Sequence, residues 1–436
     1  MAGTYITPGG DYSSSLSSVT MGGDYFSSDA SIDIHVDFRS GVLAIGNEND
    51  TDGQDLTFNF GTLLRTTGGL FLNYADRTGS TTLVGGNFGD VLHGGSGDDI
   101  LEGGAGADRL DGGGGDNTAS YEHSAAGVRV SLASGVSTGG DAQGDTLTHI
   151  GNLLGSGGAD ILAGNAGDNL LAGGAGNDTL RGAGGHDILL GGAGDDRLVM
   201  TGAGASLDGG IGKDTLFVQG SDYTEFDDRS FARIEKVYVG DTSTVNFSDV
   251  TTGTIIISRA GDDGGVGLIG SRGNDTIVGG RGANFLYGGA GDDVIRGAKD
   301  SGFSILAGEG GDDIIKAGPD LSLIVGGTGN DRLYGGAGPN LFVFEDGFGA
   351  DDIYKFKIGT DSLDVSLLVQ SFDDVIYHQI AGTKDTLVMF AGIDPANAIT
   401  LHNVNASRLS ESDFNFVPPN GPFPLDHVTF LDAFVV

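Results

Sequence analysis

The sequence predicts an all-β solenoid, and three observations support this fold class. A nine-residue period runs through much of the chain, and it is clearest where Gly94 to Glu102 is followed at once by Gly103 to Asp111. The chain holds 83 Gly but only 8 Pro and no Gly-X-Y triplet, a composition that excludes collagen and favours a repeat of tight turns. A large aliphatic residue stands at the eighth position of almost every unit, so each unit offers one side chain to a shared core.

The repeat falls into three arrays, at residues 85–117, 155–217 and 261–343. The third array slips by two residues between Gly297 and Gly308. Each unit is interpreted as six residues of turn and a three-residue strand, with successive strands alternating between two sheets, so that two units complete one coil. The eighth positions expected in the core are Leu92, Leu101, Leu110, Leu162, Leu171, Leu180, Leu189, Leu198, Leu207, Leu216, Leu268, Ile277, Leu286, Ile295, Ile315, Ile324, Leu333 and Phe342.

The segments outside the arrays are also β-patterned. Residues 1–84 are expected to form a β-rich cap or a partner-binding region. In it Ile32, Ile34, Val36 and Phe38 alternate with Ser31, Asp33, His35 and Asp37. The polar set is either a solvated strand face or a small metal or acid-base cluster. Residues 118–154 are expected to be a strand-containing linker, 218–260 a β insertion, 344–416 a C-terminal β cap and 417–436 a secretion tail.

The charge balance excludes some partners. The net charge is −38, from 60 acidic and 22 basic residues, so nucleic acid and anionic membrane surfaces are poor partners. Membrane insertion is not expected, because no apolar run approaches the ~20 residues of a membrane span. The absence of cysteine excludes disulfides and thiolate metal sites. The excess of acidic residues has two explanations. The more specific one is a multivalent cation that neutralises the carboxylates, and the simpler one is solubility.

The repeat resembles that of the RTX (repeats-in-toxin, hemolysin-type calcium-binding nonapeptide repeat) family, with signature G-G-x-G-x-D-x-U-x. The signature is matched in full by seven units, at Gly94–Glu102, Gly103–Asp111, Gly173–Arg181, Gly191–Val199, Gly209–Phe217, Gly288–Arg296 and Gly326–Tyr334. The resemblance implies a right-handed parallel β-roll, a β-helix-like solenoid, with multiple Ca²⁺ ions held between its turns.

The sixth residue of each unit is the expected calcium ligand, because calcium prefers oxygen donors and accepts carboxylates together with turn carbonyls. Units two apart stack on the same edge, so acids 18 residues apart should share an ion. One edge of the second array carries Asp160, Asp178, Asp196 and Asp214, and the other carries Asn169, Asp187 and Ala205. One edge of the third array carries Asp275, Asp293, Asp313 and Asp331, and the other carries Asn284, Gly302, Ser322 and Asn340. In the first array Asp90 pairs with Asp108, and Asp99 faces Asn117.

We therefore expect calcium mainly along one edge of the roll. The alternative is that these aspartates only form turns. The fifth-position acids are expected to be solvated rather than ligating, and they are Asp98, Asp195, Asp292 and Asp312.

No catalytic centre is recognised, so the chain is not expected to be an enzyme. The motifs H-E-x-x-H and G-x-x-x-x-G-K-[ST] are absent, and the G-x-S-x-G match at Gly135–Gly139 does not stand between a predicted strand and a predicted helix, as a nucleophile elbow would. The leading hypothesis is a secreted calcium-binding structural or cell-surface protein that folds on extracellular calcium, with self-assembly as an S-layer-like or biofilm component. The alternatives are an adhesin-like carbohydrate-binding module and a polysaccharide-acting enzyme on a β-helix groove.

Export is expected to use a type I exporter. The start of the chain lacks a basic region followed by an apolar one, which argues against a cleaved leader. The end, Leu431 to Val436, is similar to an uncleaved type I secretion signal. The expected location is therefore extracellular or at the cell surface. The expected partners are calcium, the exporter, and either further copies of the chain or a surface polysaccharide.

Overall fold

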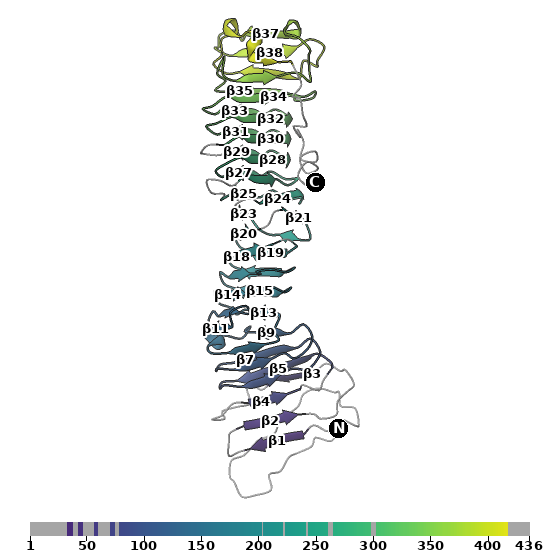
Figure 1. Ribbon diagram of the computed structural model, residues 1–436, viewed down its shortest axis with the longest axis vertical. Helices are drawn as coiled ribbons and strands as arrows, with labels where there is room; N and C mark the ends of the chain where they lie inside the picture. The colour runs from purple at the N-terminus through teal and green to yellow at the C-terminus, as the bar shows by residue number, and fades with distance from the viewer. Residues whose placement is uncertain are drawn as a thin grey trace.

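The protein is an elongated parallel β-solenoid, seen here as a computed structural model (Figure 1). The structure describes residues 33–37, 42–46, 56–59, 70–74, 78–202, 204–220, 223–240, 243–259, 265–297 and 302–416, with side chains from Leu72 onward. Successive strands alternate between two faces of the roll, as the sequence predicts. Sheets A and C form one face, and sheets B and D form the other.

The first face begins with sheet A and continues with the longer sheet C. The order in sheet A is β1 (Asp33–Asp37), β2 (Val42–Gly46), β4 (Leu70–Asn73), β6 (Val91–His93), β8 (Arg109–Asp111) and β12 (Thr146–Thr148). The order in sheet C is β11 (Val136–Thr138), β10 (Arg129–Ser131), β14 (Ile161–Ala163), β16 (Thr179–Arg181), β18 (Arg197–Thr201), β20 (Thr215–Gln219), β23 (Lys236–Val239), β25 (Ile255–Ser258), β27 (Thr276–Val278), β29 (Val294–Arg296), β31 (Ile314–Lys316), β33 (Arg332–Tyr334), β35 (Ala350–Tyr354), β39 (Ala398–Leu401), β38 (Thr386–Phe390) and β37 (Val375–Gln379).

The second face is built from sheets B and D. The order in sheet B is β22 (Phe231–Ala232), β19 (Ser206–Ile211), β17 (Ile188–Ala193), β15 (Leu170–Ala175), β13 (Asn152–Leu154), β9 (Thr118–Ser120), β7 (Ile100–Gly104), β5 (Thr81–Gly86) and β3 (Leu56–Asn59). The order in sheet D is β21 (Tyr223–Asp227), β24 (Thr244–Asp249), β26 (Val266–Ile269), β28 (Asn284–Ala290), β30 (Ser304–Gly310), β32 (Ser322–Thr328), β34 (Asn340–Val343), β36 (Ser362–Asp364) and β40 (Phe414–Asn415). Short 3-10 turns lie at Gly140–Ala142, Phe372–Asp374, Ala406–Arg408 and Glu411–Asp413.

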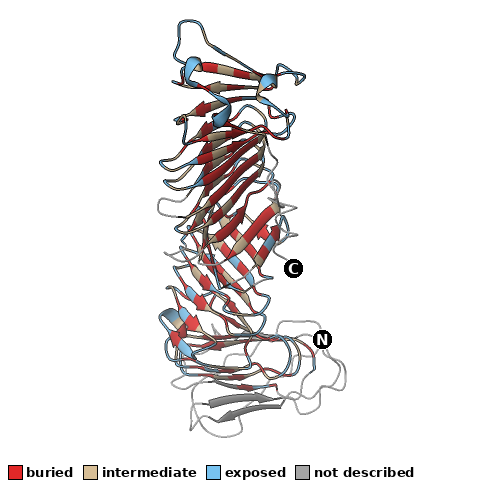
Figure 2. Cartoon of the chain, turned by 45° about the horizontal axis from the view of Figure 1, so that its top comes forward, coloured by how far each residue is buried: buried red, intermediate tan, exposed pale blue. Residues whose placement is uncertain are grey.

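The core is the stack of eighth-position side chains. Leu162 pairs with Leu180 in sheet C, and Leu171 pairs with Leu189 in sheet B, so two nine-residue units make one coil. Each of these four leucines is 0% exposed. Buried residues follow the strands along the whole column, and exposed residues gather in the turns (Figure 2). Every eighth-position residue named from the sequence is buried, so the aliphatic pattern alone located the core.

The two segments between the arrays continue the roll. In the first, β10 and β11 form an antiparallel hairpin, while β12 and β13 extend the existing sheets. In the second, β23 and β25 continue sheet C without interruption. Sheet B ends at β22, and sheet D begins at β21. A cluster of stacked and edge-on rings fills the core at this junction, and it consists of Phe226, Phe231 and Phe247.

One register expectation was wrong. The second edge of the third array carries Ser304, and not Gly302, between Asn284 and Ser322. Ser304 is 20 residues beyond Asn284, whereas Ser322 is 18 beyond Ser304. The two extra residues therefore lie between β29 and β30, and they displace both edges rather than one.

The C-terminal end of the column is closed by antiparallel strands. β37, β38 and β39 pair antiparallel, and β39 joins the roll through β35. Thr386 to Val388 and Ile399 to Leu401 fall on two of these strands, where the sequence predicts strands. A second apolar cluster, which includes Tyr287, Ile305 and Leu323, lies apart from the main core.

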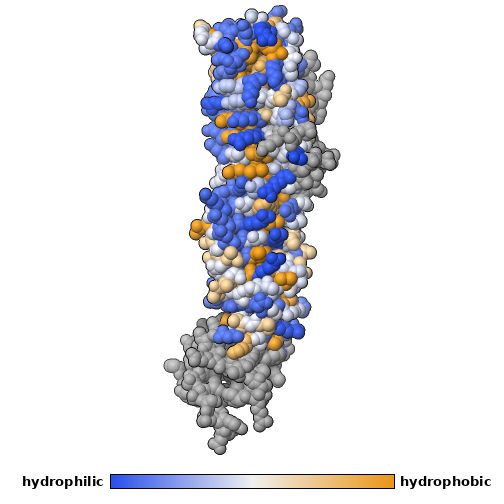
Figure 3. All heavy atoms as spheres, turned by 90° about the vertical axis from the view of Figure 1, so that its left-hand side faces the viewer, coloured by the Kyte–Doolittle hydropathy of each residue, from blue (hydrophilic) through white to orange (hydrophobic). Residues whose placement is uncertain are grey.

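Hydrophilic side chains cover much of the side shown in Figure 3, with hydrophobic ones in short bands between them. Among the described residues, no helix is long and apolar enough to cross a membrane. The alternating side chains of Ser31 to Phe38 and the tail 417–436 lie outside the described residues.

Candidate metal centre

All fourteen residues expected to bind metal are buried in the turns of the roll. Each is at most 3% exposed, and the set is Asp90, Asp99, Asp108, Asp160, Asp178, Asp187, Asp196, Asp214, Asp275, Asp293, Asp313, Asp331, Asn169 and Asn284. We call the turns that lead into sheets A and C the first edge, and those that lead into sheets B and D the second edge. Buried carboxylates require partners, because an unpaired charge is costly away from water.

One oxygen of each carboxylate on the first edge is used by the backbone of the neighbouring coil. The N–H of Asp160 donates to Oδ1 of Asp178, and the N–H of Asp178 donates to Oδ1 of Asp196, both at 2.8 Å. The same bond joins Asp90 to Asp108, Asp196 to Asp214, Asp275 to Asp293, Asp293 to Asp313, and Asp313 to Asp331. The 18-residue spacing read from the sequence is therefore a continuous ladder of hydrogen bonds.

The second oxygen distinguishes two kinds of turn. In the kind that we call closed, the N–H of the second residue of the unit donates to it. Gly95 donates in this way to Oδ2 of Asp99 at 2.7 Å, and Ser156 donates to Oδ2 of Asp160 at 2.6 Å. Gly86 and Ser271 do the same for Asp90 and Asp275, and the N–H of Asn165 donates to Oδ1, the amide oxygen, of Asn169. The hydroxyls of Ser156 and Ser271 add a further bond to their carboxylates.

In the other kind, which we call open, the second residue has a left-handed backbone and the carboxylate oxygen keeps no partner. The φ angle is 102° at Gly174, 110° at Gly192 and 102° at Gly289. These glycines belong to the units of Asp178, Asp196 and Asp293, whose Oδ2 atoms are buried without a hydrogen bond. Eight carboxylates have such an Oδ2 atom, and they are Asp108, Asp178, Asp196, Asp214, Asp293, Asp313, Asp331 and Asp351. All eight lie on the first edge.

Each open turn places a carboxylate beside main-chain oxygen. A Cβ added to Gly173 would lie 2.2 Å from Oδ2 of Asp178 and 2.6 Å from the carbonyl oxygen of Gly191. Glycine is required here because the carboxylate folds over the first residue of its own unit while the next coil presses a carbonyl against it. The same crowding recurs at Gly191, Gly288 and Gly308. An unpaired carboxylate oxygen next to carbonyl oxygens is a donor set suited to calcium.

The carboxylates of the open turns are poorly suited to carry charge without a cation. Burial, opposed by the bond from Asp160 and reinforced by neighbouring carboxylates, raises the pKa of Asp178 to about 7. The same causes raise the pKa of Asp313 to about 8 and that of Asp351 to about 9. Binding of a proton or of a metal ion therefore stabilises these carboxylates near neutral pH.

On the second edge amide side chains replace several carboxylates, although Oδ1 of Asn284 is buried without a hydrogen-bond partner. Nδ2 of Asn284 donates to the carbonyl oxygens of Gly280 and Gly282, and Nδ2 of Asn169 donates to that of Gly151. Asn117, which accepts the N–H of Asp99, likewise donates to turn carbonyls. Asp187, which accepts from Asn169, is the acid of this edge in the second array. On this edge the amide N–H groups of asparagine side chains therefore occupy main-chain carbonyl oxygens that would otherwise be free to coordinate a cation.

No group of three or more acidic or imidazole side chains suited to a metal is found within the described residues. A metal bound at an open turn would therefore take most of its ligands from main-chain carbonyls. This requirement favours calcium over zinc, because calcium accepts carbonyl oxygen in flexible numbers whereas zinc favours nitrogen and sulfur.

Sequence reasoning did not identify several acceptors of the ladders, among them Glu235, which accepts the N–H of Asp214 at 2.6 Å. Asp145 accepts the N–H of Asp108 at 2.8 Å, Asp351 accepts that of Asp331 at 2.9 Å, and Asp361 accepts that of Asn340 at 2.9 Å. A signal was present for Asp351, since Gly347, Gly349 and Ile353 keep the second, fourth and eighth positions of the unit. Irregular spacing along the chain hid the other acceptors.

The fifth-position residues form a second, exposed ladder. The N–H of Lys213 donates to Oδ1 of Asp195 at 3.0 Å, and the N–H of Asp312 donates to Oδ1 of Asp292 at 2.9 Å. Here the later coil donates to the earlier one, the reverse of the buried ladder. Asp98 and Asp312 accept in the same way. These acids are exposed to solvent, as expected, but they also join successive turns.

Comparison with known proteins identifies the repeat. The family model described as RTX calcium-binding nonapeptide repeat matches residues 84–119, 154–189, 163–198, 269–303 and 307–342. No curated protein matches the chain. Among solved structures, the extracellular lipase LipA from Serratia marcescens is similar at 18% identity and a TM-score of 0.21. That match covers 59% of this chain, and this chain spans 40% of the length of the lipase structure.

Proposed function

We propose that this chain, which carries several copies of the RTX calcium-binding nonapeptide repeat, is a secreted structural protein whose roll folds on binding extracellular calcium. Proteins with this repeat are typically secreted. Calcium is assigned to the open turns of the first edge. The closed turns are assigned a structural role, because their own N–H groups occupy the oxygens that calcium would need.

The eight unpaired carboxylate oxygens carry this proposal. A buried carboxylate oxygen without a partner costs free energy, and natural proteins keep few of them. Eight such oxygens on the same edge are accounted for by a cation that the repeated turns bind. Calcium would supply the missing positive charge, and the ladder of N–H bonds would hold Oδ1 of each carboxylate in place.

The energy of the sites is sufficient to act as a switch. RTX sites with affinities typical of extracellular modules would face calcium at about tenfold above Kd. Each independent site would then add about 1.4 kcal/mol to the free energy of unfolding. Eight such sites would add about 11 kcal/mol, which is comparable with the whole stability of a domain. The roll would therefore be open in a low-calcium cytosol and folded outside the cell.

The finer roles are part of the same proposal. The tail 417–436 is assigned to a type I exporter, and the stacked column is assigned to self-association at the cell surface or in a matrix. The proposal gives the roll no catalytic role. In the N-terminal region, Tyr74 is only 3% exposed and belongs to the hydrophobic core, so its ring does not form part of a surface binding site.

Circular dichroism during a calcium titration of the full chain tests the proposal. The expected result is a β-sheet spectrum that appears with calcium, disappears in excess chelator and returns when calcium is restored. Magnesium is the matched control, since its small octahedral shell suits a carbonyl-rich turn poorly. A β-spectrum that is unchanged in excess chelator would contradict the proposal.

A further inference from the structure

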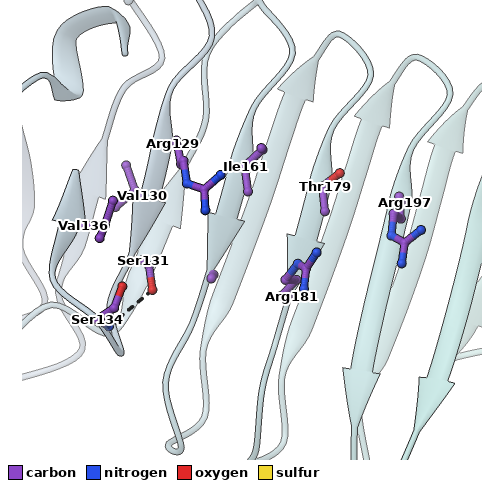
Figure 4. A pocket seen from close by; sticks show the side chains of 10 residues that line it. Arg129, Val130, Ser131, Ser134, Val136, Ile161, Thr179, Arg181 and Arg197 are labelled. Carbon is purple, nitrogen blue, oxygen red and sulfur yellow. Dashed lines mark hydrogen bonds between the residues drawn. The ribbon is translucent and has the colours of Figure 1, made fainter. Parts of the chain in front are cut away.

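A shallow groove of about 560 Å³ lies on the outer face of sheet C, where the β10–β11 hairpin meets β14, β16 and β18 (Figure 4). The core leucines of these strands point inward, so the residues on either side of them face the solvent. The wall of the groove includes Arg129, Arg181 and Arg197, together with the hydroxyl side chains Ser131, Ser134 and Thr179. The hairpin closes one end of the groove.

The charge of the groove is the reverse of the charge of the chain. Acidic residues outnumber basic ones by 60 to 22 overall, yet no acidic residue lines the groove. None of its three arginines forms an ion pair with a described residue. Nε of Arg197 is buried and has no hydrogen-bond partner in the described part of the chain. Uncompensated guanidinium groups in so acidic a protein indicate an anionic ligand.

The spacing of the arginines follows the strands. Arg129, Ile161, Thr179 and Arg197 occupy one row across four neighbouring strands, and Arg181 stands in the next row. Strands of a sheet are about 4.8 Å apart, so Arg129 and Arg197 start about 14 Å apart, with Arg181 between them. Such a row suits an extended chain of regularly spaced negative charges better than a single small anion.

An aromatic and cationic platform adjoins the groove on the same face. The rings of Phe217 and Tyr238 stack with their centroids 5.0 Å apart. The guanidinium of Arg197 lies 3.6 Å from the centre of the Phe217 ring, and that of Arg259 lies 3.9 Å from that of Tyr238. Stacking holds Arg197 flat against the sheet, with its charge available to the groove. The platform therefore presents planar, rigid surfaces next to hydroxyl groups.

We propose that this groove binds an acidic polysaccharide, a polymer of hydroxylated rings that bear carboxylates. The arginines would pair with the carboxylates, because a guanidinium matches a carboxylate with two parallel hydrogen bonds. Ser131, Ser134 and Thr179 would bind ring hydroxyls. The flat faces of the stacked side chains and of Ile161 would contact the apolar faces of the rings. A rigid sheet loses little conformational freedom when a stiff polymer lies on it.

Competing anions are less favoured by the same residues. Double-stranded nucleic acid carries one negative charge per about 1.7 Å of helix axis, so the net charge of −38 repels it more strongly than a polymer with one carboxylate per sugar ring. An acidic peptide would use the arginines but not the three hydroxyl side chains. These alternatives remain outcomes of the test.

Isothermal titration calorimetry on the calcium-loaded full chain tests the proposal with an oligogalacturonide as ligand. We expect saturable binding that Arg181→Gln and Arg197→Gln each weaken by about ten- to hundredfold, as expected for loss of a charge-assisted hydrogen bond. Arg296→Gln is the matched control, because Arg296 is exposed on β29 of the same sheet but does not line the groove. A calcium-dependent circular dichroism spectrum that matches the wild type shows that each variant is folded.

Four results would overturn the proposal. They are the absence of binding, equal weakening by Arg296→Gln and Arg181→Gln, binding of polyglutamate as tight as that of the oligogalacturonide, and tighter binding of single-stranded DNA. Polyglutamate would indicate an acidic protein partner, and DNA would indicate a nucleic acid. The calcium proposal stands or falls separately, because folding is measured without the saccharide.

Discussion

The main-chain N–H of Asp178 donates to Oδ1 of Asp196 at 2.8 Å, while Oδ2 of Asp196 is buried without a partner. One oxygen of the carboxylate therefore fixes the neighbouring coil, and the other remains for a cation. This division of work within one side chain links the stacking of the roll to metal binding, because a carboxylate that is held in place loses little freedom when it binds an ion.

The two edges of the second array should differ in their dependence on calcium. Replacing Asp178 and Asp196 by Ala removes two open-turn carboxylates, at about 1.4 kcal/mol for each site and about 1 kcal/mol for each ladder bond. Replacing Asn169 and Asp187 by Ala removes hydrogen bonds but no unpaired buried oxygen. The calcium concentration at the folding midpoint, followed by circular dichroism, should rise more for the first pair. Equal shifts would show that the assignment of the first edge is wrong.

Ser271 should stabilise the roll without binding calcium. Its N–H and its hydroxyl both donate to Oδ2 of Asp275, at 2.6 and 2.9 Å. Ser271→Ala removes the hydroxyl bond to a buried carboxylate and should cost about 1–2 kcal/mol. Thermal unfolding in saturating calcium should show a lower melting temperature, and calorimetry should show the same number of bound calcium ions. A reduced ion count would mean that this closed turn is a metal site.

Without calcium, the roll should be more stable in acid than in alkali. The pKa of Asp293 is raised to about 7, that of Asp313 to about 8 and that of Asp351 to about 9, all mainly by burial. Because these values exceed the ordinary value of 3.8, the folded state binds more protons than the unfolded state between that pH and about 9. The free energy of unfolding must therefore fall as the pH rises through this window.

Circular dichroism in chelator at pH 5 and at pH 8.5 measures this effect. More β-structure at pH 5 is expected, and the difference should vanish in saturating calcium. More β-structure at pH 8.5 in chelator would contradict the raised pKa values of the ladder.

The sequence predicted the repeating part of the fold closely, for a physical reason. Leu162 and Leu180 stack because each unit has one large aliphatic side chain, and solvent does not reach its position in the coil. The nine-residue period then fixes how each strand pairs with the strand of the next coil. The residues along each edge followed from the 18-residue spacing of units that stack on that edge. The position of Ser304 was missed because the sequence alone does not indicate on which edge of a coil a two-residue insertion lies. The open and closed turns were missed because Gly95 and Gly104 are the same residue type at the same position, and only Gly104 adopts a left-handed backbone.

Removal of Leu425 to Val436 should separate export from folding. These residues belong to the tail that is assigned to the exporter, and they lie beyond the described roll. The deletion should abolish secretion from cells that carry a type I exporter, while the purified protein should still fold on calcium addition. If secretion survives the deletion, Leu425 to Val436 are not the export signal. Loss of calcium-induced folding would instead make the segment part of the cap.

A crystal structure of the calcium-bound chain, with calcium located by its anomalous scattering, tests the central claim most directly. The account predicts ions on the first edge against Oδ2 of Asp178, Asp196, Asp293 and Asp313, in contact with turn carbonyls. It predicts no ion against Oδ2 of Asp99 or Asp275, which the N–H groups of Gly95 and Ser271 occupy. Ions at the closed turns, or along both edges alike, would contradict it.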